Sequence, residues 1–203
     1  MLETIFEFDR GITFFINGAH TPFWDAIMLF FSSKTVWIPL YLAMAAAMFF
    51  PKWYGKPQIK GWVAALIGIG AILVAFGLTD QICNLLKNTT ERLRPGHDPI
   101  TGPLMWLPDG KGGLYTFPSA HAANSMCLAV LTSLIFRRKW YTITLVSWSI
   151  IIGFSRIYLA RHFFTDVLCG LILGAIIAYL IYKLWEKVWN IYLKKHNQQC
   201  SVS

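Results

Sequence analysis

Residues 117–158, FPSAHAANSMCLAVLTSLIFRRKWYTITLVSWSIIIGFSRIY, contain two apolar runs that are separated by one basic turn. The first run is Phe117–Phe136, the turn is Arg137-Arg138-Lys139, and the second run is Trp140–Tyr158. A helix needs about 20 residues to cross the hydrocarbon core of a bilayer, and each run has about this length. The stretch therefore predicts a hairpin of two membrane-spanning helices and an all-α fold.

The composition of the whole chain agrees with this prediction. Of its 203 residues, 56% are apolar and only 14% are charged, whereas soluble domains carry about 25% charged residues. This balance excludes an ordinary soluble domain, and it also excludes a disordered chain. The net charge of +8 would favour a nucleic-acid partner in a soluble protein. In a membrane protein the placement of the charges matters more, so we expect no nucleic-acid partner.

Further apolar segments extend the hairpin to a polytopic bundle of five to six spans. Two of them, Gly61–Leu86 and Phe163–Trp185, are long enough alone, and Met28–Ser33 joined to Val36–Phe50 makes a fifth span. Residues 1–26 predict an N-terminal interfacial helix, because acidic residues and a break at Asn17-Gly18 interrupt the apolar pattern. A sixth, tilted span is the alternative for this region.

The basic residues alternate between the two sides of the predicted bundle. The connection after the first span, the turn at 137–139 and the tail hold ten of the 18 basic residues and a single acid. The rest of the chain holds eight basic and nine acidic residues. Basic connections are typical of the cytoplasmic side. We therefore expect one domain over 1–203, with an outer loop at 87–116 and a cytoplasmic tail at 186–203.

Three groups of polar residues fall on the predicted outer side, where charges beside spans are functional candidates. In the first, Lys87 and Arg94 are seven residues apart and share a face if the helix continues to Pro95. In the second, Ser119 suits an N-cap at a helix start that binds anions, with His121 in the first turn. Alone, the first would be read as basic residues that reach toward head groups, and the second as a plain cap.

The third group is Arg156 with His162 and Asp166. His162 and Asp166 are four residues apart, so on a helix the carboxylate would hold one ring nitrogen and leave the other nucleophilic. Alone, it would be a paired histidine at a helix start. Together, the three groups supply cations, a helix N-terminus, a nucleophile and a second histidine on one side of the membrane. That set can hold a phosphoryl group and transfer it.

The order of these residues resembles the three-part signature of the type 2 phosphatidic acid phosphatase superfamily. The matching pattern is Lys87-x6-Arg94-Pro95, Pro118-Ser119-x-His121 and Ser155-Arg156-x5-His162-x3-Asp166. Ala120 is the one departure, because the family most often has glycine there. Its methyl group adds bulk beside the anion site but removes no catalytic group.

The resemblance implies a two-step phosphoryl transfer that needs no cofactor and no metal. His162 would attack phosphorus and form a phosphohistidine that Asp166 stabilises, while His121 would protonate the leaving oxygen and then activate water. The phosphate oxygens would be bound by Lys87, Arg94, Ser119 and Arg156. The sequence has no carboxylate or histidine cluster for a metal, and Cys83, Cys127, Cys169 and Cys200 form no close pair.

Several polar residues border the predicted site outside the signature. Arg92, His97 and Arg161 are candidate contacts to a lipid head group, although a solvated loop would also explain each of them. Asp80 lies seven residues before Lys87 and either tunes that lysine or makes a structural hydrogen bond.

The resemblance further implies a small bacterial lipid phosphatase of the inner (cytoplasmic) membrane with its site facing the periplasm or the outside. Its substrate would be a phospholipid or polyprenyl phosphate in the bilayer, and undecaprenyl diphosphate is the first expectation. The alternatives are lipid A, phosphatidylglycerophosphate and phosphatidic acid. Two other classes compete: a vanadate-dependent haloperoxidase, whose known forms are soluble and larger, and a non-catalytic membrane scaffold or transporter. The oligomeric state is left open.

Overall fold

The structure, a computed structural model, describes residues 2–54 and 60–200. In this part of the chain the regular elements are all helical, which confirms the predicted all-α class. One isolated antiparallel bridge joins Leu93 and Tyr115. The helices are α1 (Leu2–Gly18), α2 (Pro22–Ser32), η1 (Thr35–Trp37), α3 (Ile38–Ala47), η2 (Pro51–Tyr54), α4 (Gly61–Thr90), η3 (Gly102–Leu104), α5 (Ala120–Phe136), α6 (Lys139–Tyr158) and α7 (Phe164–Cys200).

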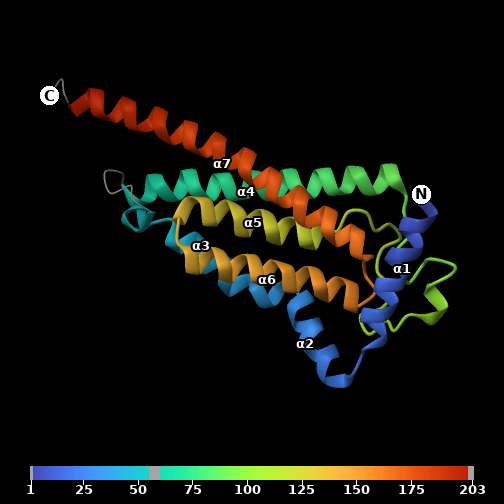
Figure 1. Cartoon of the computed structure of the whole chain (residues 1–203). Coiled ribbons are helices and arrows are strands. Elements are labelled where there is room, and N and C mark those ends of the chain that lie inside the picture. The colour runs from blue at the N-terminus through green and yellow to red at the C-terminus, as the bar shows by residue number, and fades with distance from the viewer. Residues whose placement is uncertain (1, 55–59, 201–203) are drawn as a thin grey trace.

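Helix α5 forms the centre of the bundle. It runs between α4 and α6, with α7 crossing beside it (Figure 1), and it has buried side chains along its whole length. Two glycines of α7 make the contact with α5 close. A Cβ on Gly170 would lie 2.6 Å from the carbonyl oxygen of Ser119, and one on Gly174 would also clash with the α5 backbone. Small residues of this kind let membrane helices approach closely.

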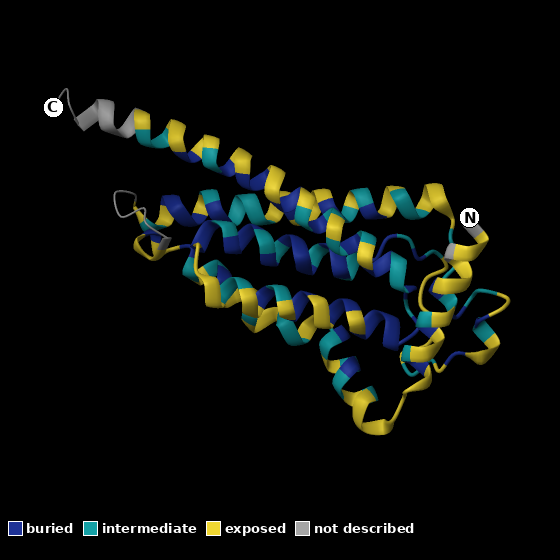
Figure 2. Cartoon of the chain, in the orientation of Figure 1, coloured by how far each residue is buried: buried dark blue, intermediate teal, exposed yellow. Residues whose placement is uncertain are grey.

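The outer faces of the bundle are apolar. Figure 2 shows buried positions on α5 and on the sides of its neighbours that face it, and exposed positions on the outside. Large exposed apolar side chains on the outer faces include Leu66, Leu73, Leu85, Ile143, Ile150, Ile172, Ile176 and Leu180. An exposed apolar surface of this extent marks contact with a membrane.

In the described part of the chain, two helices are long and apolar enough to cross a bilayer. They are α4 and the Phe164–Lys194 part of α7, with mean hydropathies of 2.3 and 2.2. Helix α5 is apolar but has only 17 residues. The predicted fifth span is wrong as a continuous helix, because α2 and the Thr35–Ala47 segment meet at a bend of 62°. If this bent pair counts as one span there are three, so a count of five or six stays a prediction.

The predicted N-terminal helix over 1–26 is divided into two helices. Helix α1 ends at Gly18, and α2 begins at Pro22, where the Thr21 hydroxyl accepts a hydrogen bond from the backbone N–H of Trp24. A cap residue followed by proline is a strong helix start, so one helix could not continue to residue 26. Helix α1 lies across one end of the bundle (Figure 1).

The two ends of the bundle carry different connections. The α5–α6 hairpin forms as predicted, and it turns at Arg137, whose φ of 55° lies in the left-handed region. This basic turn lies at the end opposite α1, whereas the α4–α5 loop and the α6–α7 turn lie at the α1 end (Figure 1). The predicted outer loop begins later than expected, because α4 continues through Lys87 to Thr90. The predicted tail at 186–203 begins inside α7, which runs on as helix to Cys200.

Candidate active site

His162 lies in the turn between α6 and α7 and is almost fully buried, with 1% of its surface exposed. The Arg156 carbonyl oxygen holds this turn, because it accepts the backbone N–H groups of both Arg161 and His162. His162 therefore precedes α7, and the expectation that it shares a helix with Asp166 is wrong. The distance from His162 Nδ1 to Asp166 Oδ2 is 3.8 Å, which is too long for a hydrogen bond.

Thr116 bridges this pair. Its Oγ1 lies 2.9 Å from His162 Nδ1 and donates to Asp166 Oδ2 at 2.5 Å. A threonine hydroxyl has one hydrogen, and the carboxylate takes it, so Nδ1 must be the donor to Oγ1. This hydrogen-bond network assigns the ring proton to Nδ1 and leaves the lone pair on Nε2. Burial, and then the positive charges of Arg156, Arg94 and Lys87, lower the pKa of His162, so its ring is neutral and nucleophilic.

Asp166 is fixed from three directions. Its Oδ2 also accepts the backbone N–H of Phe163 at 2.8 Å, which caps the first turn of α7. Its Oδ1 accepts Arg92 Nη1 at 2.7 Å. The other terminal nitrogen of Arg92, Nη2, donates to Asp9 Oδ2 at 2.5 Å. The Arg92 guanidinium also lies 4.5 Å from the ring centre of Phe163. Arg92 therefore pairs with two of the protein's own carboxylates, and its predicted contact with a lipid head group stays a prediction.

Asp9 was not expected to reach the site. It is fully buried, and besides Arg92 it accepts the backbone N–H of Thr165 at 2.9 Å and the Thr165 hydroxyl at 2.5 Å. Thr13 and Asn17 are also buried and follow at spacings of four residues, so α1 turns one polar stripe inward. That spacing is the signal by which the sequence could have shown that α1 packs on the protein.

A backbone pairing brings Arg94 to the site, instead of the predicted helical face. Helix α4 ends at Thr90, and residues 92–94 then pair with 114–116: Arg94 N–H donates to the Leu114 carbonyl oxygen, and Thr116 N–H to that of Arg92. The Arg94 Nε donates to the Tyr115 carbonyl oxygen at 3.0 Å. The same pairing thus fixes Arg94 and Thr116 together. Burial, and then the charge of Arg161, lower the pKa of Arg94.

Arg156 is the most deeply placed cation. It is 5% exposed, its Nη1 donates to the Ser32 hydroxyl, and its Nε has no hydrogen-bond partner among the described residues. A buried guanidinium with an unused donor is suited to bind an anion. Lys87 completes the set in the last turn of α4. These are the three cations whose charges act on His162.

The start of α5 adds backbone donors beside the cations. Ser119 is fully buried, and its Oγ caps α5 by accepting the Ala122 N–H at 3.5 Å. Its own N–H donates to the Asp166 carbonyl oxygen at 3.0 Å, so the α5 N-terminus lies against the start of α7. Helix N-termini of this kind bind phosphate. His121 is in the first turn of α5.

The two remaining candidate head-group contacts, Arg161 and His97, bond to the α4–α5 loop. Arg161 pairs with Asp109, with Nε 2.9 Å from Oδ2. It also lies next to Arg94 over Gly112, where a Cβ would be 2.7 Å from Arg94 Nη1 and where φ is +72°. His97 Nε2 lies 3.3 Å from the Gly112 carbonyl oxygen. These contacts give Arg161 and His97 roles in shaping the loop beside Arg94.

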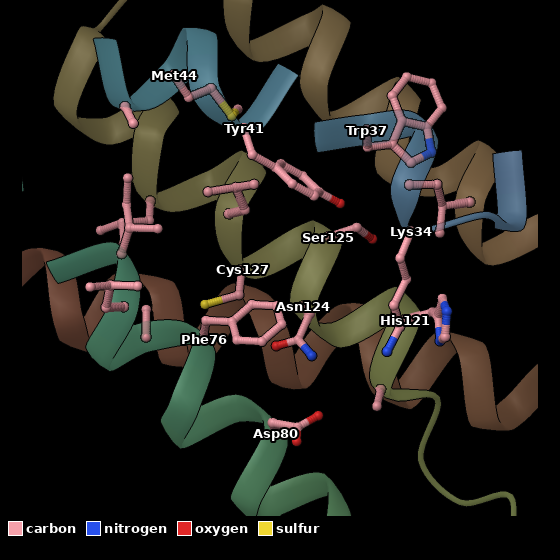
Figure 3. Close-up of a pocket in the computed structure, with 18 of the residues that line it drawn as sticks. Lys34, Trp37, Tyr41, Met44, Phe76, Asp80, His121, Asn124, Ser125 and Cys127 are labelled. Carbon is pink, nitrogen blue, oxygen red and sulfur yellow. The ribbon is translucent and has the colours of Figure 1, made fainter. Parts of the chain in front are cut away.

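A cavity of about 320 Å³ opens from His121 into the bundle (Figure 3). Its wall comes from the bent α2–α3 segment, α4, α5 and one residue of α6, and it is mostly apolar. Leu73 and Phe76 line it and are exposed, so it is open toward the outer face of α4. Lys34, at the bend, reaches into it toward His121 (Figure 3). Among the described residues, no group of three or more His, Cys, Asp or Glu side chains could hold a metal ion.

The geometry suits phosphoryl transfer. A neutral imidazole with a free Nε2 lies in the field of three cations, beside a helix N-terminus and near a second histidine. An anionic phosphoryl group would be held by charges that are already in position, and held groups react without reorganisation of the site.

Comparisons with known sequences point to the same chemistry. The model of the PAP2 superfamily matches residues 68–190. The chain is 34% identical over 192 residues to a protein of Bacteroides thetaiotaomicron named lipid A 4'-phosphatase, with 93% of this chain and 81% of that protein covered. A protein of the same name from Porphyromonas gingivalis is 34% identical over 186 residues, with 91% and 75% covered.

Solved structures share the fold. The PAP2-type phosphatidylglycerolphosphate phosphatase of Bacillus subtilis superposes with a TM-score of 0.69 and 26% identity, covering 91% of this chain and 88% of that one. Aquifex aeolicus LpxE has a TM-score of 0.64 at 22% identity, covering 85% and 93%, and shows likeness of fold alone. Sequence signature, family match and relatives agree, and the chain belongs to the PAP2 superfamily of membrane lipid phosphatases.

Proposed function

We propose that this phosphatase removes a phosphate group from lipid A, with His162 as its nucleophile. Two relatives that cover more than nine tenths of the chain are named lipid A 4'-phosphatases. Undecaprenyl diphosphate, the first expectation from the sequence, has no support among the relatives described above. Lipid A, which was an alternative, is therefore the better-supported substrate. Phosphatidylglycerophosphate is the second candidate, because of the likeness to the B. subtilis enzyme.

One observation carries the mechanism: Thr116 donates its only hydrogen to Asp166, so His162 keeps a free Nε2. In the first step this lone pair attacks phosphorus and the ester P–O bond breaks. His121 gives its proton to the leaving oxygen, and the phosphoryl group stays on Nε2. In the second step His121 takes a proton from water, the hydroxide attacks phosphorus, and the P–N bond breaks. Inorganic phosphate leaves and His162 is restored.

The developing charge is met by groups that are already in place. Lys87, Arg94, Arg156 and the Ser119 end of α5 bind the non-bridging oxygens. The buried Nε–H of Arg156 has no other acceptor in the described chain, so the phosphate fills an unmet hydrogen bond. Asp166 balances the positive charge of the phosphohistidine ring through Thr116.

The orientation follows from the charges at the two ends of the bundle. The basic α5–α6 turn and the α3–α4 connection lie at the end opposite the site (Figure 1). Basic connections stay in the cytoplasm, so the site faces the periplasm or the outside of the inner membrane. The chain is one domain whose spans are the bent α2–α3 pair, α4, α5, α6 and α7. Helix α1 lies in the outer interface, with Phe8 and Phe15 exposed toward it.

The test is phosphate release from defined lipids by purified protein in detergent. Lipid A, phosphatidylglycerophosphate, phosphatidic acid and undecaprenyl diphosphate are compared by kcat/KM, and mass spectrometry follows the loss of one phosphate group from lipid A. We expect lipid A to lead. His162→Gln should lower kcat at least about 1000-fold, as removal of an enzyme nucleophile does, and a labelled phosphoryl group should be trapped on the wild-type protein.

His20→Gln is the matched control, because this histidine is exposed between α1 and α2 and stacks on Trp106. If another lipid leads, the proposed substrate is wrong while the mechanism stands. If His162→Gln keeps its activity, the nucleophile is wrong. If no lipid is hydrolysed, the scaffold explanation replaces both.

A further inference from the structure

The cavity beside His121 gathers polar side chains at the end that His121 lines. Lys34 from the α2–α3 bend, Asp80 from α4 and Asn124 from α5 line this end, and His121 opens onto it (Figure 3). The rest of the wall is mostly apolar and includes Met44, Ile72 and Leu131, with hydroxyl groups from Tyr41 and Ser125 (Figure 3). Three polar side chains from three separate elements therefore meet at the point where the cavity reaches the catalytic histidine.

These side chains have unused hydrogen-bonding capacity. Lys34 is exposed, and within residues 2–54 and 60–200 its Nζ makes no hydrogen bond and no ion pair. Asn124 Oδ1 is buried and has no partner. Asp80 accepts one long hydrogen bond, from Asn84 Nδ2 at 3.3 Å. Buried polar atoms are almost always satisfied, so the unpartnered Asn124 Oδ1, which faces the cavity, points to a ligand.

The reaction decides which part of the substrate reaches this end. His162 attacks phosphorus from one side, and the leaving oxygen departs on the opposite side, where His121 protonates it. The atoms bonded to that oxygen must then lie beyond His121, between Lys34, Asp80 and Asn124. The apolar part of the cavity lies further on and can take hydrocarbon chains. This step rests on the proposed function of His162 and His121.

We propose that Lys34, Asp80 and Asn124 form a subsite for an oxygen-rich leaving group, the sugar ring that carries the phosphate. Lys34 Nζ and Asn124 Nδ2 donate to ring, ester or amide oxygens, and the Asp80 carboxylate and Asn124 Oδ1 accept from hydroxyl or amide N–H groups. A prenyl alcohol has none of these groups and leaves Asn124 Oδ1 without a partner. A diphosphate would bring a second anion to the Asp80 carboxylate. The subsite thus selects phosphomonoesters of sugars over prenyl phosphates.

The experiment compares two phosphomonoester lipids, lipid A and undecaprenyl phosphate, in wild-type protein and in Lys34→Met and Asp80→Asn. A site built to hydrogen-bond a substrate loses selectivity when the bond is removed. We expect each variant to lower kcat/KM for lipid A about tenfold or more and to change that for undecaprenyl phosphate by less than about twofold. Lys34→Arg, which keeps the charge and the donors, should keep most of the wild-type ratio of kcat/KM on lipid A to kcat/KM on undecaprenyl phosphate.

Lys183→Met is the matched control, since Lys183 is an exposed lysine that pairs with Glu186 far from the site. An equal loss on both lipids overturns the subsite, because Lys34 would then act on the phosphate itself. No loss on either lipid also overturns it. If wild-type protein fails to hydrolyse lipid A, the proposed substrate falls. The subsite is then tested by comparing phosphatidylglycerophosphate, whose leaving group carries a free hydroxyl, with undecaprenyl phosphate. Lys34→Met and Asp80→Asn should again lower kcat/KM on the first lipid far more than on the second.

Discussion

Replacing Asp9 by asparagine tests whether α1 positions the catalytic groups. Asp9 accepts three hydrogen bonds, from Arg92 Nη2 and from the N–H and hydroxyl of Thr165. Both Asp9 and the facing Asp166 are fully buried, and Arg92 joins them. The variant keeps the shape of the side chain but removes its charge and turns an N–H donor toward either Arg92 or Thr165.

The magnitude follows from this arrangement. Removing one partner of a buried ion pair costs about 3–5 kcal/mol. Asparagine keeps one acceptor, so we expect the free energy of unfolding to fall by about 2–3 kcal/mol. Arg92 is then held only by Asp166 and Thr165, and a shift of Asp166 moves Thr116 and His162 with it. Displacements of about 1 Å at a reacting group lower rates about 100-fold, so we expect kcat to fall about 10- to 100-fold.

The assay measures kcat and KM on the preferred lipid together with the denaturation midpoint of the purified protein. KM should change little, because Asp9 contacts none of the residues that bind the phosphate group. Glu7→Gln is the control: it removes an acid of the same helix that is exposed. If Asp9→Asn keeps wild-type kcat, or if its activity falls only in proportion to the folded fraction, α1 does not position the catalytic groups.

Three further outcomes are expected. Thr116→Val should lower kcat about 100-fold by breaking the bridge to Asp166, while Thr116→Ser should keep most of the activity. The pKa of His162 is lowered from 6.5 in the folded protein. Below pH 6.5 the unfolded chain therefore binds more protons than the folded one, and the free energy of unfolding falls as the pH falls. Measured against pH, this decrease should be smaller in His162→Gln. Gly174→Ala should destabilise by about 2 kcal/mol because its Cβ meets the α5 backbone, whereas Gly77→Ala, with open space around its Cβ, should not, as thermal unfolding would show.

The features that depend only on residues close together in the chain could be predicted from local sequence patterns. The hairpin at 117–158, the cap at Ser119 and the basic turn at 137–139 each follow from periodicity, length and charge within one segment. The site end of the bundle could also be foreseen, because the alternation of basic connections is a property of the whole chain.

Contacts between segments that lie far apart in the chain could not be predicted from the sequence. Thr116 lies 46 residues from His162, and nothing in the spacing of His162 and Asp166 shows that a hydroxyl bridges them. Arg92 was expected at the substrate because a lone arginine carries no sign of its partner, and Asp9 is 83 residues away. Lys34 was not singled out in the sequence, because only the 62° bend between α2 and the next helical segment places it at the cavity.

The inward stripe of α1 has a consequence for how the protein is made. Its partners are Arg92, Trp106, Tyr158 and Thr165, so every one of them is synthesised after α1 itself. Thr165 lies in the first turn of the last helix, so Asp9 cannot complete its hydrogen bonds before that helix has emerged from the ribosome. The hydrogen-bond network of this first segment is therefore completed last. Nascent protein should stay inactive until biogenesis is complete, which spares the lipids around the insertion machinery from an unfinished enzyme.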